Sequence, residues 1–116
     1  MKKSTRDYLL DMAGSVNDIR AFTAGMDSVA FGRDRKTQLA VIRAFEVIGE
    51  VAKRLPDALL DQQASVDWRA VKGFRDVLIH QYDAVDTVIV WDAVERISDV
   101  QHAVEALLAS LPPEDE

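Results

Sequence analysis

The sequence predicts an all-α fold, an antiparallel bundle of four long helices with one short helical turn between the second and the third. Three observations support this fold class. Apolar residues recur at steps of three and four over long stretches, no stretch shows the alternation of a half-buried strand, and the connections are short, which places consecutive helices antiparallel. We expect one domain over residues 1–111 of the 116 and an acidic tail at 112–116.

The first helix is expected over residues 4–26. Ser4 and Asp7 form an S-x-x-D start, in which the hydroxyl caps free backbone N–H groups. Gly25 or Gly32 marks its exit. Its apolar stripe consists of Tyr8, Met12, Val16, Ile19 and Met26.

The second helix is expected over residues 35–55, with Asp34 as its cap. Pro56 ends it, because proline cannot continue a helix. A short helical turn is expected around residues 58–61. The apolar stripe of the second helix is wide and consists of Val41, Ala44, Phe45, Ile48, Val51, Ala52 and Leu55.

The third helix is expected to start near Asp67, and the fourth to run without interruption from after Asp86 to about Ser110. Gly73 lies inside the third helix, where glycine costs about 1 kcal/mol relative to alanine. Close approach of another helix would account for it. The apolar face of the third helix consists of Trp68, Val71, Phe74 and Leu78, and that of the fourth of Val90, Val94, Ile97, Val104 and Leu108.

Composition is that of an ordinary globular protein, with 48% hydrophobic and 29% charged residues. The absence of cysteine excludes disulfides and thiolate metal sites, and fits a cytoplasmic location. No apolar run is long enough to cross a bilayer. No signal-peptide core follows the lysines at the start of the sequence, because charge returns at Asp11.

The net charge of −6 is unevenly distributed. Residues 1–32 carry four basic and four acidic groups. Residues 33–75 carry nine basic and six acidic groups, and residues 76–116 carry one basic and ten acidic groups. An acidic chain is an unusual nucleic-acid binder, but a local basic field attracts phosphate. Two interpretations stay open: a basic surface for RNA, or charged helix faces that are only solvated.

The segment RDVLIHQY, residues 75–82, sets polar groups into the third helix. Successive residues of an α-helix are about 100° apart. Arg75 and Tyr82 therefore share one face, and Asp76 and His80 share another, so that Asp76 is expected to orient the imidazole. Arg75 and His80 lie about 140° apart. Either the helix loosens near His80, or a second copy of the motif in a symmetric dimer completes the site.

This chemistry suits the cleavage of a phosphodiester. Arg75 offers a permanent cation to phosphate oxygens, and His80 exchanges protons near neutral pH. Cleavage of RNA without a metal requires a base for the 2′-hydroxyl and an acid for the leaving 5′-oxygen. One histidine cannot be both at once, whereas a dimer supplies two. Spacing alone leaves a second interpretation open, in which Arg75 is an ordinary surface arginine and His80 an ordinary hydrogen-bonded histidine. In that interpretation Tyr82 is a half-buried tyrosine.

RDVLIHQY resembles the R-x-x-x-x-H-x-Y signature of the HepT-like toxins, a branch of the HEPN superfamily of helical ribonucleases. The resemblance extends over RDRKTQLAVIRAFEVIGEVAKRLP at 33–56, VDWRAVKGFRDVLIHQYDAVD at 66–86 and VW at 90–91, and so over most of the chain. It implies a HEPN-like, homodimeric, metal-independent endoribonuclease without a cofactor. It also implies that Arg75 and His80 are catalytic and face their counterparts across a cleft.

The resemblance further implies a partner and a means of control. The partner is a minimal nucleotidyltransferase, the antitoxin of a type VII-like toxin–antitoxin system, which transfers AMP from ATP onto the motif tyrosine, here Tyr82. The family commonly has asparagine where this chain has Asp76. Aspartate would raise the basicity of His80 but would place negative charge near the scissile phosphate. The rival hypothesis is a catalytically silent helical adaptor that binds a nucleotidyltransferase or a nucleotide.

Other groups are weaker candidates. The family resemblance implies that Glu50 reaches the cleft. The alternative is that Glu50 and Glu46, four residues apart, lie together on a solvated helix face. Asp99 and His102 form a D-x-x-H pair, but a di-iron bundle requires two E-x-x-H pairs and further glutamates, so no metal site is predicted. There is no phosphate-binding glycine loop. The candidate RNA-binding cations are Lys53, Arg54 and Lys72.

Overall fold

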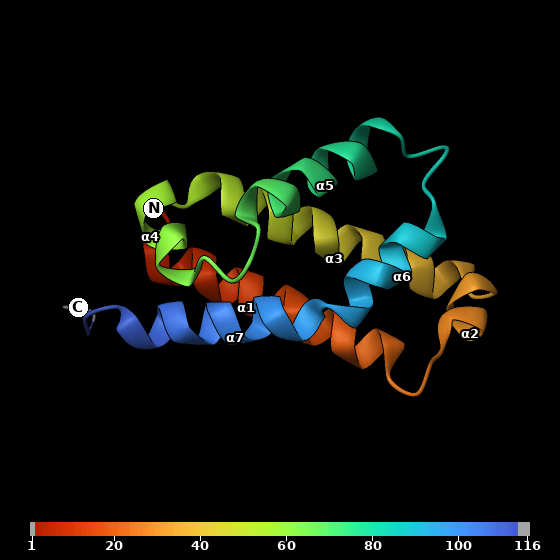
Figure 1. The fold of residues 1–116 in the computed structure, drawn as a ribbon, viewed down its shortest axis with the longest axis horizontal. Coiled ribbons are helices and arrows are strands. Elements are labelled where there is room, and N and C mark those ends of the chain that lie inside the picture. Colours follow the sequence, from red (N-terminus) through yellow and green to blue (C-terminus); the bar gives the residue numbers. More distant parts are fainter. Residues whose placement is uncertain (1, 114–116) are drawn as a thin grey trace.

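The computed structural model describes residues 2–113, which are helical and contain no strand, so the predicted all-α class is confirmed. Figure 1 shows the long helices running back and forth along the longest axis, which measures 47 Å. The elements are α1 (Thr5–Thr23), α2 (Ser28–Gly32), α3 (Arg35–Arg54), α4 (Asp57–Leu60), the 3₁₀-helix η1 (Asp61–Gln63), α5 (Trp68–His80), α6 (Thr87–Glu95) and α7 (Ile97–Ser110).

Four helices begin at the capping residues that the sequence predicts. Each capping side chain accepts a hydrogen bond from a backbone N–H in the first turn of its helix, which satisfies a donor that the helix leaves free. α1 ends three residues earlier than predicted, and Gly25 beyond it has a φ of 77°, which favours glycine. Gly25 rather than Gly32 therefore marks the exit. The four capping residues are Ser4, Asp34, Asp67 and Asp86.

α3 is the central element of the bundle, because both α1 and α5 pack along it, while α7 packs on α1. The residues of its predicted wide apolar stripe are all buried in the core. The fully buried side chains with the largest volumes come from α1, α2, α3 and the later helices: Leu9, Met12, Val16, Ile19, Phe31, Val41, Ile48, Leu60, Leu78, Val90, Val104 and Leu107.

Two features differ from the prediction. The short helix α2 was not expected; its Phe31 is buried and contacts Trp91 of α6, with ring centroids 5.2 Å apart. The expectation of one uninterrupted helix from Asp86 to Ser110 is wrong, because the chain turns at Arg96 between α6 and α7. α6 packs against α2, whereas α7 packs along α1, so the two segments follow different partners.

Residues 114–116 of the predicted acidic tail lie outside the described residues, and the proposed domain boundary stays a prediction. Within residues 2–113, no helix is both long and apolar enough to cross a membrane.

Candidate active site

The motif residues occupy the C-terminal half of α5 and the turn beyond it. α5 ends at His80, since Gln81 has φ −114° and ψ 36°. The helix therefore stops beside His80, which is one of the two alternatives that the sequence left open. Tyr82 lies in the following turn and is 81% exposed. The prediction that Tyr82 shares a helical face with Arg75 is wrong for this reason, and so is the alternative of a half-buried tyrosine.

A close contact between α3 and α5 fixes the position of Arg75. A Cβ atom built on Gly49 of α3 would lie only 2.2 Å from the Cβ of Arg75 and 3.1 Å from the carbonyl oxygen of Val71. Any side chain at position 49 would therefore force the two helices apart. The close approach expected at Gly73 is absent, because a Cβ there meets no atom within 4 Å. Gly49 has the role that the sequence analysis assigned to Gly73.

Two carboxylates hold the guanidinium of Arg75, whose side chain is 25% exposed. Its Nη2 lies 3.0 Å from Oε1 of Glu50, and its Nη1 lies 3.1 Å from Oδ1 of Asp76. Glu50 is thus in contact with the motif arginine. The Nε of Arg75 is buried and has no acceptor among the described residues. Each terminal nitrogen carries two N–H donors and uses one on a carboxylate, so each keeps a second donor for a phosphate oxygen.

The neighbours of these carboxylates are the cations at the end of α3. The Nε of Arg54 lies 3.1 Å from Oε2 of Glu50, and Lys53 forms an ion pair with Asp76. Hydrogen bonds from Lys53 and Arg75 lower the pKa of Asp76. The pKa of Arg54 is raised, first by its hydrogen bond to Glu50 and next by the Tyr8 side chain.

The predicted contact between Asp76 and His80 is not formed. His80 is exposed, and no hydrogen bond or ion pair of its side chain occurs among residues 2–113. The carboxylate of Asp76 instead binds Arg75 and Lys53, both through its Oδ1. Asp76 therefore positions the arginine of the motif, and the imidazole of His80 is left available to a partner outside this chain.

The three candidate RNA-binding cations separate into two groups. Lys53 and Arg54 join the cluster around Arg75, as described above. Lys72 instead lies in the first half of α5, where its Nζ is 3.0 Å from Oδ1 of Asp57 in α4. At position 102 the histidine is exposed, and no group of three or more His, Asp or Glu side chains within the described part of the chain could hold a metal ion.

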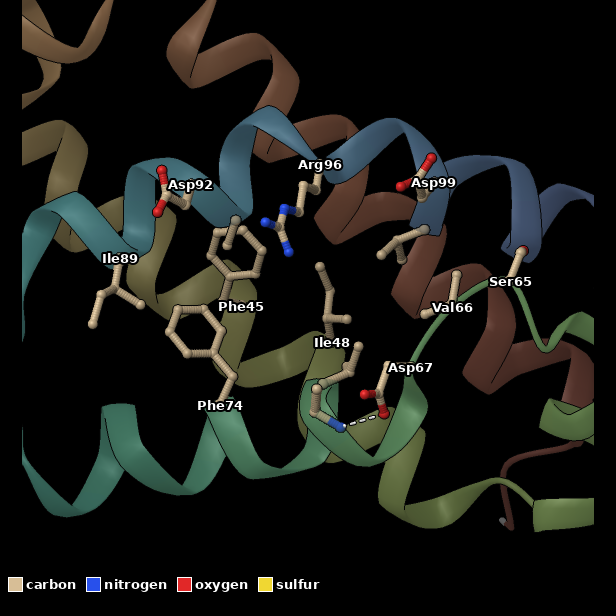
Figure 2. Close-up of a pocket in the computed structure, with 14 residues that line it drawn as sticks. Phe45, Ile48, Ser65, Val66, Asp67, Phe74, Ile89, Asp92, Arg96 and Asp99 are labelled. Atoms are coloured by element: carbon tan, nitrogen blue, oxygen red, sulfur yellow. Dashed lines mark hydrogen bonds between the residues drawn. The ribbon is translucent and has the colours of Figure 1, made fainter.

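A cavity of about 580 Å³ lies on α3, between α5 and the corner of α6 and α7. Figure 2 shows its apolar floor, where the rings of Phe45 and Phe74 meet edge to face at 5.4 Å, and shows Arg96 reaching over Ile48. No motif residue lines it. A smaller cavity of about 390 Å³ is lined by Arg75 and Glu50. We regard the smaller cavity as the relevant one, because Arg75 of the motif lines it together with Arg54 and Glu50.

The arrangement is a cationic cluster between α3 and α5, with an unpartnered histidine at the end of α5. Three cations surround two carboxylates, so the cluster carries one surplus positive charge: Lys53, Arg54 and Arg75 against Glu50 and Asp76. Such a cluster can attract an anion to a fixed arginine. Sequence reasoning placed Glu50 there only by resemblance and missed Gly49, although a glycine inside the strong apolar stripe of the second helix was a signal of close packing.

Comparison with known proteins agrees with this chemistry. The chain is 37% identical, over 99% of its length and 96% of the relative's, to a protein of Methanocaldococcus jannaschii named as a candidate RNase. It is 41% identical, over 83% of its length and 87% of the relative's, to a protein of Thermococcus cleftensis named as a probable ribonuclease HepT. No solved structure matches the chain significantly. The family model described as ribonuclease HepT-like matches residues 12–107, and the chain belongs to this family.

Proposed function

We propose that this protein is an endoribonuclease that cleaves RNA without a metal, through Arg75 and His80. The observation that supports the proposal most is the arginine fixed by Glu50 and Asp76 five residues before an unpartnered histidine at the end of the same helix. The family membership and the names of the relatives point to the same class of reaction.

The reaction requires a base and an acid. The base removes the proton of a ribose 2′-hydroxyl, whose oxygen attacks the adjacent phosphorus and forms a 2′,3′-cyclic phosphate. The bond from phosphorus to the 5′-oxygen breaks, and the acid gives that oxygen its proton. His80 acts as one of these groups, and Arg75 stabilises the negative charge that grows on the phosphate oxygens.

A homodimer would supply the second histidine. On the side of α5 that bears the motif, Val77 is 46% exposed, and in α6 Val88 and Ile89 are 67% and 55% exposed. Exposed apolar side chains in the motif and in α6 are suited to contact with a second copy of the chain. A two-fold axis near His80 would then bring two imidazoles and two arginines into one cleft.

Control by AMP transfer fits the exposure of Tyr82. An antitoxin of the nucleotidyltransferase class must reach the hydroxyl that it modifies, and Tyr82 lies in an open turn two residues after His80. AMP at this position would add bulk and a negative phosphate beside the proposed RNA path. The proposed role is therefore that of the toxin in a toxin–antitoxin pair.

Cleavage in excess EDTA tests the proposal. Wild-type protein should cut single-stranded RNA, and His80→Ala and Arg75→Ala should each lose at least about a hundredfold, the low end for acid–base catalysis. His102→Ala is the matched control, because this histidine is exposed on α7 and should be dispensable. Folded wild-type protein that binds a nucleotidyltransferase or a nucleotide but never cuts RNA would favour the second candidate, a silent adaptor whose Arg75 stays neutralised by its two carboxylates.

A further inference from the structure

The cavity beside Arg75 extends well away from the motif. It has a volume of about 390 Å³ and lies between the start of α1, the second half of α3 and the end of α5. This volume is within the range of sites that hold small organic ligands. Its lining includes Lys3 and Tyr8 from the region of α1, Val47 and Arg54 from α3, and Arg75 and Ile79 from α5.

The charges of the cavity leave one positive charge unbalanced. Four cations and three carboxylates line it, and every carboxylate has a cationic partner. Arg54 and Arg75 share Glu50, and Asp76 outside the cavity is likewise shared by Arg75 and Lys53, so the surplus charge lies at the end of the cavity next to Arg75. This matches the single negative charge of a phosphodiester. The pairs are Lys3 with Asp11 at 2.5 Å, Arg43 with Glu46 at 3.4 Å, and Glu50 with Arg54 at 3.1 Å and with Arg75 at 3.0 Å.

The aromatic ring of Tyr8 offers a surface for a base. Lys3 lies over this ring, with its Nζ 5.6 Å from the ring centroid, so that face of the ring is reached from solvent. The Lys3 side chain is 54% exposed and can move away easily. Stacking of a base on a tyrosine ring contributes more binding free energy than the contact of an exposed ammonium with that ring. A base in this position would also contact the apolar side chains of Val47 and Ile79.

We propose that this cavity binds one nucleotide of single-stranded RNA, the one that adjoins the phosphate held by Arg75. The base stacks on Tyr8, and Arg54 and Arg75 neutralise the phosphate. The site gives the enzyme affinity for unpaired RNA, because a paired base cannot enter the cavity. This inference rests on the proposed ribonuclease function and adds the class of substrate structure that it recognises.

The test measures binding separately from cleavage. The probe is a short fluorescent RNA carrying 2′-O-methyl groups, which cannot be cut by 2′-hydroxyl attack. Tyr8→Leu should weaken binding by at least about fivefold, the low end for the loss of one stacked base, and Tyr8→Phe should recover most of that loss. Phe22→Leu is the matched control at the far end of α1, where the ring is 43% exposed, and should bind like the wild type.

A second variant does not depend on Tyr8. Arg54→Gln should reduce the slope of log Kd against log salt concentration by about 0.7, the value for one phosphate contact to a single strand. In cleavage assays Tyr8→Leu should raise KM while His80→Ala lowers kcat, which separates recognition from chemistry. Thermal unfolding of each variant confirms that it is folded.

The outcomes distinguish the two proposals. Active wild-type enzyme with unchanged probe binding in Tyr8→Leu, or an unchanged salt slope in Arg54→Gln, would overturn the nucleotide site and leave the ribonuclease intact. AMP that binds as tightly as the RNA probe would overturn it too, because the ligand would then be a free nucleotide. Wild-type protein that neither binds nor cuts RNA would overturn the ribonuclease itself.

Discussion

Two glycines in neighbouring helices should respond in opposite ways to the same substitution. Gly49→Ala puts a methyl group 2.2 Å from the Cβ of Arg75, an atom that cannot move without its helix. Overpacking of this kind costs about 1–3 kcal/mol, and a contact so short belongs near the upper value. The better helix propensity of alanine returns about 1 kcal/mol. We therefore expect a net loss of about 2 kcal/mol, or a fall in Tm of about 8 °C.

Gly73→Ala is the matched control, because it also replaces a helical glycine but meets no atom within 4 Å. It should gain about 1 kcal/mol and raise Tm by about 4 °C. Calorimetry or circular dichroism measures both changes. Gly49→Ala should also lose cleavage, since it displaces Arg75 while His80 remains intact. A Gly49→Ala protein as stable as Gly73→Ala would refute the close contact between α3 and α5.

Four further outcomes follow from the site. Asp76→Asn keeps a side-chain oxygen that can accept from Arg75 and so position it, but removes the negative charge beside the phosphate; it should raise cleavage by up to about fivefold, the effect of about 1 kcal/mol between exposed charges, and unchanged or lower activity would contradict this effect of the charge. The fold lowers the pKa of Asp76 below its ordinary value of 3.8. The ionised carboxylate therefore stabilises the fold above that pH, and this stabilisation is lost as the pH falls through the lowered pKa. Unfolding curves of Asp76→Asn, measured against pH, should lack this part of the acid dependence. Tyr82→Phe should keep its cleavage and escape modification by the nucleotidyltransferase and ATP, which intact-mass spectrometry detects; AMP on Tyr8 instead would place the switch elsewhere. Light scattering should give about twice the chain mass of 12.9 kDa, and a monomer with full activity would exclude the composite site.

Much of the fold follows from local chemistry that a sequence displays. A capping side chain such as Asp34 or Asp67 acts on its own first turn, and apolar periodicity identifies the buried face, so helix starts and cores are predictable. The break at Arg96 is not, because no glycine or proline marks it and its cause is the different packing of α6 and α7. The position of a helix end also changes which side chains share a face. Helical spacing predicted that Arg75 and Tyr82 share one, but α5 ends at His80, so this spacing does not apply to Tyr82.

The candidate site was less predictable than the helices. Periodicity shows which faces of α3 and α5 are buried, but it does not give the register that sets Gly49 against Arg75 and brings Glu50 to its guanidinium. The same limit explains the wrong partner for Asp76. Spacing on one helix suggested His80, whereas Lys53 on the neighbouring helix and Arg75 bind the carboxylate in the structure.

The most direct test of the central claim uses a strand of 2′-O-methyl nucleotides that contains one ordinary ribonucleotide. Folded protein is incubated with it in EDTA, and the products are identified by mass spectrometry. The account predicts a single cut after the ribonucleotide, with a 2′,3′-cyclic phosphate on the upstream fragment, and a loss of at least about a hundredfold in His80→Ala. Cleavage that needs a metal ion, that occurs at 2′-O-methyl positions, or that persists in His80→Ala would contradict it.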